Sequence, residues 1–353
     1  MRLTELRKAL DKYTLDAILI GQPENRRYLS GFSGSAGWLF ISADRAVLAA
    51  DFRYYEQVRR EAPGFELARI ESKFSDLLVA MVADWDVRRL GFESEHVTVD
   101  QLYTWSQATK GLEWIPLRGT VEATRAVKDE DEIEALRRST ALTDTAFARL
   151  LEILRPGMTE REAAWQIEAT MRTHGASKVA FDLIVAAGPN GALPHACASD
   201  RAIQAGEPIV IDIGCVLDGY CSDMTRTICL GQPSPKYLKV WEIVLQAQEA
   251  AEAAICAGMS GVDADALARN LIEQAGYGEC FGHGLGHGVG LAVHEKPRAS
   301  WLSKDTLEAG MALTIEPGIY LPGEFGVRIE DLVIIREEKA EILTSAPKMP
   351  VVA

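Results

Sequence analysis

Hydrophobic and polar residues follow two periods along roughly the first 120 residues, a pattern that predicts a small α/β domain. Leu6 and Leu10, for example, have helical spacing, whereas two apolar runs flank the polar turn 42–45 as in a β-hairpin. The expected helices are residues 4–13, 54–60, 74–84 and 101–108. The expected strands are residues 17–20, 38–41, 46–50 and 90–92.

The pattern changes near residues 120–132, where a charge run at 128–132 precedes a long apolar stripe. Acidic residues favour the start of a helix, because they interact with its positive dipole end. Ile133, Leu136 and Phe147 then recur with helical spacing. We therefore place a domain boundary here and expect domains at residues 1–124 and 125–353.

The second domain contains an internal sequence repeat. Gly157, Met158 and Gly175 each recur 101 positions later, and Ser260 occupies the position that matches Thr159. Each set opens a predicted helix with capping-box spacing and closes it at a glycine suited to a left-handed backbone. Strand-like segments follow each helix, at residues 183–187 and 209–213 and then at 312–315 and 327–335. The domain is therefore expected to consist of two related halves, with an active site that draws residues from both.

Composition narrows the classes of function. A hydrophobic content of 48% and a charged content of 25% are ordinary for a globular protein. The net charge of −14 argues against a nucleic-acid or anionic-membrane partner, because no basic patch is available to neutralise phosphates. We find neither an apolar run of bilayer length nor a signal-peptide pattern, and the cysteines form no C-x-x-C pair. These features predict a cytoplasmic protein.

Ligand-type residues occur in the order Asp, Asp, His, Glu, Glu, each in its own short motif. They are Asp212, Asp223, His287, Glu316 and Glu330. A hairpin through the turn at 214–219 would bring the two aspartates side by side, although a salt bridge with Arg226 is an alternative for either one. Four carboxylates and one imidazole carry too much negative charge for one divalent ion and suit two ions with shared carboxylates. The set therefore predicts a two-metal hydrolase.

Other motifs in the sequence do not match a helical zinc site, a dinucleotide site or a zinc-protease motif. The glycine- and histidine-rich segment 281–290 is too rich in glycine for a helix that could present His283 and His287 to zinc, and no βαβ unit surrounds it as a dinucleotide site would require. His294-Glu295 lacks the second histidine of a zinc-protease motif. Strand alternation places Arg328 on the same face as Glu330, where it could orient a ligand carboxylate or form an ordinary ion pair.

These residues resemble a known family. The ordered ligand set, together with His-Gly-x-Gly-x-x-x-His-Glu at 287–295, resembles the pita-bread metallopeptidases, which include methionine aminopeptidase, aminopeptidase P, Xaa-Pro dipeptidase (prolidase) and the non-metal creatinase. Residues 31–37 and 51–54 resemble the creatinase-type N-terminal domain of the proline-specific members. The resemblance implies an α+β protein with a small α/β creatinase-type domain followed by a pseudo-symmetric, duplicated catalytic domain.

The resemblance also implies roles. Asp212 would bind one metal, His287 and Glu316 mainly the other, and Asp223 and Glu330 would bridge the two. Glu316 would also shuttle a proton, and His195 and His294 would contact the substrate carbonyl. His283 matches a weaker position that lines the site. Manganese is the expected metal, and the oxygen-rich set also tolerates cobalt, zinc or iron.

The implied substrate is a small peptide with proline in the second position. Arg298 resembles a prolidase residue and could clamp the free carboxylate of a dipeptide. The motifs at 34–37 and 51–54 are more similar to aminopeptidase P, which acts on longer peptides. We favour the dipeptidase, keep aminopeptidase P as the alternative, and regard a catalytically dead binding module as a poorer fit because all the ligand residues are present. The aromatic residues between Trp38 and Tyr55 further suggest a homodimer.

Overall fold

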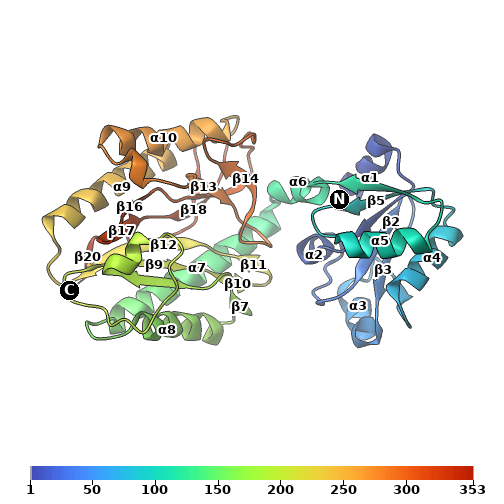
Figure 1. The fold of residues 1–353 in the computed structure, drawn as a ribbon, viewed down its shortest axis with the longest axis horizontal. Helices are drawn as coiled ribbons and strands as arrows, with labels where there is room; N and C mark the ends of the chain where they lie inside the picture. Colours follow the sequence, from blue (N-terminus) through green and yellow to red (C-terminus); the bar gives the residue numbers. More distant parts are fainter. Residues whose placement is uncertain (1, 353) are drawn as a thin grey trace. The chain divides into compact units, whose positions relative to one another are not determined.

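The computed structural model describes residues 2–352. These residues divide into two compact units, with the boundary along the chain between Arg125 and Ala126 (Figure 1). None of the helices formed by these residues combines the length and the apolarity that crossing a bilayer requires. Each unit has its own buried core.

The first unit is an α/β domain built on a mixed sheet with the strand order β4-β3-β2-β1-β5-β6. Its strands are β1 (Ala17–Ile20), β2 (Trp38–Ser42), β3 (Ala46–Ala50), β4 (Glu66–Arg69), β5 (Arg89–Glu93) and β6 (Glu113–Leu117). Its helices are α1 (Arg2–Tyr13), α2 (Pro23–Ser30), α3 (Tyr55–Glu61), α4 (Phe74–Asp84), α5 (Val99–Ala108) and α6 (Thr120–Ala126), the last of which ends at the first residue of the second unit. The predicted hairpin is confirmed, since β2 and β3 pair antiparallel.

Two of the aromatic residues that suggested a dimer surface, Trp38 and Phe40, belong to the core of the domain. Phe40 is fully buried, and Trp38 stacks on Phe74 with ring centroids 5.2 Å apart. Phe52, in contrast, is 78% exposed. Trp38 and Phe40 therefore stabilise the domain core, whereas Phe52 does not contribute to it.

The second unit contains two helix pairs with strands between them (Figure 1). The helices are α7 (Glu130–Ile153), α8 (Glu160–Thr173), α9 (Pro235–Ala254) and α10 (Gly261–Gln274). One sheet has the order β20-β12-β9-β8, formed by β20 (Val351–Val352), β12 (Met224–Leu230), β9 (Pro208–Ile213) and β8 (Ile184–Ala187). A second has the order β15-β18-β19, formed by β15 (Ala312–Ile315), β18 (Asp331–Ile334) and β19 (Glu341–Ile342). The remaining ladders involve β7 (Lys178–Val179), β10 (Cys215–Leu217), β11 (Tyr220–Cys221), β13 (Gly286–Gly288), β14 (Glu295–Ala299), β16 (Gly318–Leu321) and β17 (Phe325–Arg328).

The internal sequence repeat corresponds to repeated structure. Gly157 N–H donates to Ile203 O at 2.9 Å, and Gly258 N–H donates to Leu307 O at 2.8 Å. Thr159 caps α8 through a full capping box, whereas Ser260 caps α10 by accepting from the Asp263 N–H. One buried core lies with α7 and α8, and another lies with α9 and α10. The second unit thus has two halves, as the sequence predicts.

One expected strand is wrong. Residues 327–335 do not form a single strand but divide into β17 and β18, which belong to different sheets. Glu330 lies between them, and its N–H donates to Thr225 O of β12 at 3.0 Å. This bond to another sheet interrupts the strand and turns Glu330 toward β12.

Candidate metal centre

Two of the expected metal ligands lie on adjacent antiparallel strands of the first half. β9 carries Asp212 directly opposite Thr225 of β12, and Asp223 immediately precedes β12. Residues two apart on a strand share a face, so Asp223 and Thr225 face the same side as Asp212. The predicted hairpin is therefore confirmed.

The other three ligands come from the second half. His287 lies on β13, Glu316 follows β15, and Glu330 follows β17. Backbone bonds fix the two glutamates, since Glu316 N–H donates to Leu285 O at 2.8 Å and Glu330 N–H donates to Thr225 O at 3.0 Å. The site thus draws residues from both halves.

The side chains of these residues converge. Across the described part of the chain, Asp223, His287 and Glu330 offer ligand atoms that all lie within 4.8 Å of one another. His287 Nε2 is 3.7 Å from Asp223 Oδ2 and 3.4 Å from Glu316 Oε1. Asp223 and Glu330 are 5% and 2% exposed, so this is an interior cluster.

Burial and crowding disfavour the ionised acids. Burial raises the pKa of Asp223 well above its usual value, and the carboxylates of Glu330, Asp212 and Glu316 raise it further. Burial and then Glu316 and Asp212 likewise raise the pKa of Glu330. The pKa of Glu316 is also raised, chiefly by burial. Since a nearby cation favours the charged form of an acid, the cluster is short of positive charge.

The cluster fits a bound cation in two further respects. Asp212 Oδ2 accepts from Arg328 at 2.5 Å, yet the buried Asp212 Oδ1 has no hydrogen-bond partner among residues 2–352. A buried carboxylate oxygen without a donor calls for a ligand such as a metal ion. Burial also lowers the pKa of His287, which keeps the imidazole neutral and able to coordinate a metal.

Arg328 is a buried cation among these acids. Its guanidinium donates to Asp212 Oδ2, to Thr225 Oγ1 at 3.1 Å and to the Tyr320 hydroxyl at 2.6 Å. The expectation that Arg328 orients a carboxylate of the cluster thus has a matching contact. The Arg226 alternative is wrong, because Arg226 pairs with Asp331 at 2.6 Å.

Sequence reasoning missed three hydroxyl groups at the site, of which two contact expected ligands and the third contacts Arg328. Thr225 Oγ1 donates to Glu330 Oε2 at 2.6 Å, and Thr314 Oγ1 donates to Glu316 Oε1 at 3.0 Å. Tyr320 receives its bond from Arg328 and lies 3.0 Å from His283 Nε2. Strand alternation from Asp223 could have identified Thr225, whereas Tyr320 depends on pairing between strands.

The expected substrate-side residues lie around the cluster. The His294 ring packs edge-on against His287 with centroids 4.4 Å apart. Arg298 on β14 is directly opposite His287 on β13, so the two side chains share a face of that ladder. Burial, then His287 and Arg298, lower the pKa of His294, which favours the neutral ring.

His195 and His283 have looser connections. His195 is exposed and follows the carbonyl of Pro194, which accepts from Arg328 at 3.2 Å. Its charged form also contributes to the lowered pKa of His294. His283 reaches the cluster indirectly, through Tyr320 and Arg328. The structure therefore gathers the expected ligands closely, places His294 and Arg298 beside His287, and connects His195 and His283 to them only indirectly.

A duplicated α+β domain with a carboxylate-rich centre and a separate N-terminal domain is the architecture of a metallopeptidase. The chain belongs to metallopeptidase family M24, whose model matches residues 134–337. Residues 2–127 match the creatinase/prolidase N-terminal domain. The expected family and fold class are confirmed, and the protein is a hydrolase.

Individual relatives are similar over nearly the whole chain. The Xaa-Pro dipeptidase of Pyrococcus furiosus is 37% identical over 348 residues, which cover 98% of both chains. The solved Xaa-Pro dipeptidase from Bacillus anthracis is 41% identical with a TM-score of 0.97, covering 100% of this chain and 99% of that one. The solved X-Pro aminopeptidase from Thermotoga maritima is 40% identical with a TM-score of 0.91, covering 98% of this chain and 100% of that one.

Proposed function

We propose that this protein is a two-metal Xaa-Pro dipeptidase that hydrolyses the bond before proline in a dipeptide. The observation that carries the metallopeptidase assignment is the buried carboxylate cluster with its unpartnered Asp212 Oδ1. Relatives named Xaa-Pro dipeptidase, which match almost end to end, support the substrate class.

Charge supports two divalent ions. When ionised, the four carboxylates and the Arg328 guanidinium together carry a net charge of −3, which exceeds the +2 of a single divalent ion. Asp212 would hold one ion and His287 and Glu316 mainly the other, and Asp223 and Glu330 would be shared by both ions. Hard oxygen ligands suit manganese, and cobalt, zinc or iron are also compatible.

The chain's own residues would then perform distinct steps. When bound, the ions supply Lewis-acid polarisation of the scissile carbonyl and activation of water. Glu316 can hold a proton and pass it to the leaving nitrogen. His294 and His195 border the same space and can donate hydrogen bonds to the substrate carbonyl.

We assign the preference for a dipeptide substrate to Arg298. It lies opposite His287 on the β13–β14 ladder, where its guanidinium can bind the free carboxylate of the substrate through two parallel hydrogen bonds. The prolyl amide has no N–H, so the site needs no acceptor for that nitrogen.

The second candidate is an aminopeptidase P that removes the first residue of longer Xaa-Pro peptides. Its support is the 40% identity to the Thermotoga maritima X-Pro aminopeptidase. A catalytically dead binding module has less support, because the expected ligands are present and converge.

Hydrolysis of Ala-Pro and Ala-Pro-Ala with added manganese separates the two candidates. We expect Ala-Pro to be the better substrate and Arg298→Ala to raise its KM more than that of the tripeptide. Arg149→Ala is a matched control, because Arg149 is an exposed arginine whose ion pair with Glu152 lies on the surface. Hydrolysis of the tripeptide alone would favour the aminopeptidase.

We also propose a homodimer with domains at residues 1–124 and 125–353. The exposed Phe52 ring is an apolar side chain available for a contact between subunits. Light scattering should give twice the monomer mass of 38.6 kDa, and a fully active monomer would contradict the dimer.

A further inference from the structure

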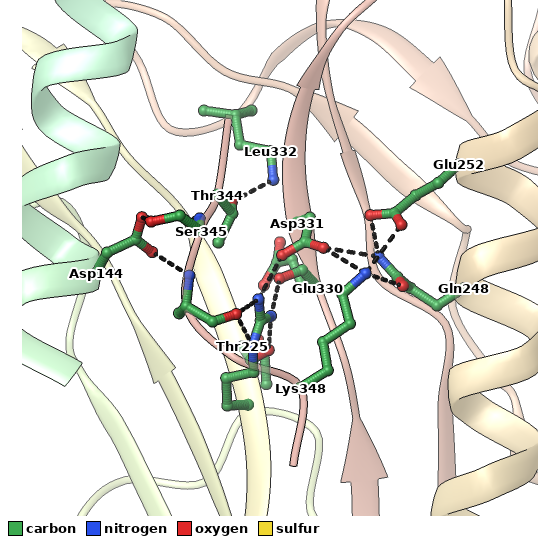
Figure 2. Close-up of polar contacts among 12 residues, drawn as sticks. Asp144, Thr225, Gln248, Glu252, Glu330, Asp331, Leu332, Thr344, Ser345 and Lys348 are labelled. Carbon is green, nitrogen blue, oxygen red and sulfur yellow. Dashed lines mark hydrogen bonds and ion pairs between the residues drawn. The ribbon is translucent and has the colours of Figure 1, made fainter. Parts of the chain in front are cut away.

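A second buried polar cluster adjoins Glu330. It centres on Asp331, the next residue in the chain, and includes Gln248 and Glu252 of α9 and Lys348 (Figure 2). Lys348 belongs to residues 344–348, which we call the tail segment. Glu330 accepts a hydrogen bond from Thr225 Oγ1 at the metal centre, whereas Asp331, the first residue of β18, accepts from Arg226 and Gln248 in this cluster.

Arg226 connects the cluster to the backbone of Glu330. It is 2% exposed and donates to Glu330 O at 2.6 Å and to Asp331 Oδ1 at 2.6 Å. It also donates to Ala346 O of the tail segment at 2.6 Å. One guanidinium thus holds the carbonyl of an expected metal ligand, the next carboxylate and the tail segment together.

Lys348 completes the charge balance around Asp331. Its Nζ lies 2.7 Å from Asp331 Oδ2 and 2.9 Å from Glu252 Oε2, and it donates to Gln248 Oε1 at 2.7 Å. Two cations, Arg226 and Lys348, therefore face two carboxylates, Asp331 and Glu252. Without Lys348, Asp331 would keep its pair with Arg226, but the Asp331 and Glu252 carboxylates would face each other with no shared cation.

The tail segment is also tied to other elements (Figure 2). Asp144 of α7 accepts from Ser345 N–H at 2.8 Å, from Ser345 Oγ at 2.7 Å and from Ala346 N–H at 3.1 Å. Thr344 Oγ1 accepts from Leu332 N–H at 3.0 Å. Lys348 and Arg226 are therefore held in a fixed frame that spans α7, α9 and β18.

We propose that the tail segment, through Lys348 and Arg226, positions Glu330 for metal binding. The inference rests on the proposed role of Glu330 as a metal ligand. Lys348 is a positioning residue, since it acts on Glu330 only through Asp331 and Arg226. Buried ion pairs contribute little net stability compared with apolar packing, so a role in fixing geometry accounts better for this cluster.

The test is a titration of metal-free protein with Mn²⁺, measured by calorimetry, for Lys348→Met and Lys348→Arg. We expect Lys348→Met to weaken Mn²⁺ binding by about 10-fold, the lower range for loss of a group that orients a ligand. Lys348→Arg should retain most of the affinity, because it keeps the charge and donors. Lys236→Met is the matched control, since Lys236 lies on α9 in an exposed ion pair with Glu324.

Wild-type affinity in Lys348→Met would overturn the inference, and so would an equal loss in Lys348→Arg. If Lys348→Met fails to fold, the same titration of Asp144→Asn decides, because this change loosens the tail segment from the α7 side. Weaker Mn²⁺ binding by Asp144→Asn would support the inference, and unchanged binding would contradict it. Failure of the wild-type protein to bind Mn²⁺, Co²⁺, Zn²⁺ or Fe²⁺ would instead refute the proposed function, so the two failures are distinguishable.

Discussion

At the scale of single residues, the adjacent carboxylates of Glu330 and Asp331 have pKa values that are shifted in opposite directions by their surroundings. Burial, then Glu316 and Asp212, raise the pKa of Glu330. Burial acts in the same direction on Asp331, but Arg226 and Lys348 outweigh it and lower its pKa. One carboxylate is left in need of a cation, and the other is already neutralised by the protein.

Glu252 gives a pH-dependent stability with a defined sign. Burial, then Asp331, raise the pKa of Glu252 to about 7. In the unfolded chain a glutamate titrates near pKa 4.3, roughly, so between these values the folded protein binds more protons. The free energy of unfolding should therefore fall as pH rises through this window.

Glu252→Gln cannot ionise and should remove this contribution. Measured by urea unfolding of metal-free protein, the free energy of unfolding of Glu252→Gln minus that of wild type should increase from about pH 4 to about pH 7 and then level off. A difference that is flat across this range would show that Glu252 does not titrate there.

Lys128 and Glu295 provide a residue-scale test of stability. They form an ion pair at 3.1 Å with side chains only 1% and 5% exposed. Lys128→Met should cost about 3–5 kcal/mol in the free energy of unfolding, because it leaves the Glu295 carboxylate buried without its cation.

Lys296→Met is the comparison for this change. Lys296 pairs with Asp305 at 3.2 Å but is 53% exposed, so its replacement should cost less than about 1 kcal/mol. Equal costs for the two variants, measured by urea unfolding, would contradict the account of the buried pair.

At the scale of elements, the glycine-rich segment 281–290 allows β13 to approach its neighbours closely. A Cβ at Gly286 would lie 1.8 Å from Thr314 O, whereas a Cβ at Gly282 would meet nothing within 4 Å. Gly286 thus brings His287 next to β15, which leads into Glu316.

Gly286→Ala should destabilise the protein by about 1–3 kcal/mol or more, because the added methyl overlaps backbone that cannot move freely. Gly282→Ala should change the free energy of unfolding by no more than about 0.5 kcal/mol. Mn²⁺ affinity should fall in the first variant only. Similar behaviour of both in thermal unfolding and Mn²⁺ titration would contradict the proposed close packing.

Local pattern was sufficient for many elements and for identifying acidic and histidine residues that converge in the cluster. The hairpins, the capped helices α8 and α10 and the convergence of Asp212 with Asp223 follow from spacing along the chain. The break at Glu330 and the contacts of Tyr320 do not, because they depend on hydrogen bonds between distant strands. The amphipathic α2 and the long α9 were not predicted from the sequence pattern.

At the scale of the whole molecule, duplication explains why the ligands are scattered along the chain. Each half of the second unit has its own core and helix pair, and each contributes ligand-type residues to the cluster where the halves meet. Neither half alone contains a complete set. The proposed chemistry therefore depends on both halves being folded together.

The most direct test is proline release from Ala-Pro by metal-stripped protein that is titrated with Mn²⁺. The account predicts no release without metal and a rate that rises until two equivalents of Mn²⁺ per chain are bound. Absence of proline release at every Mn²⁺ ratio, or full activity in the metal-free protein, would contradict it.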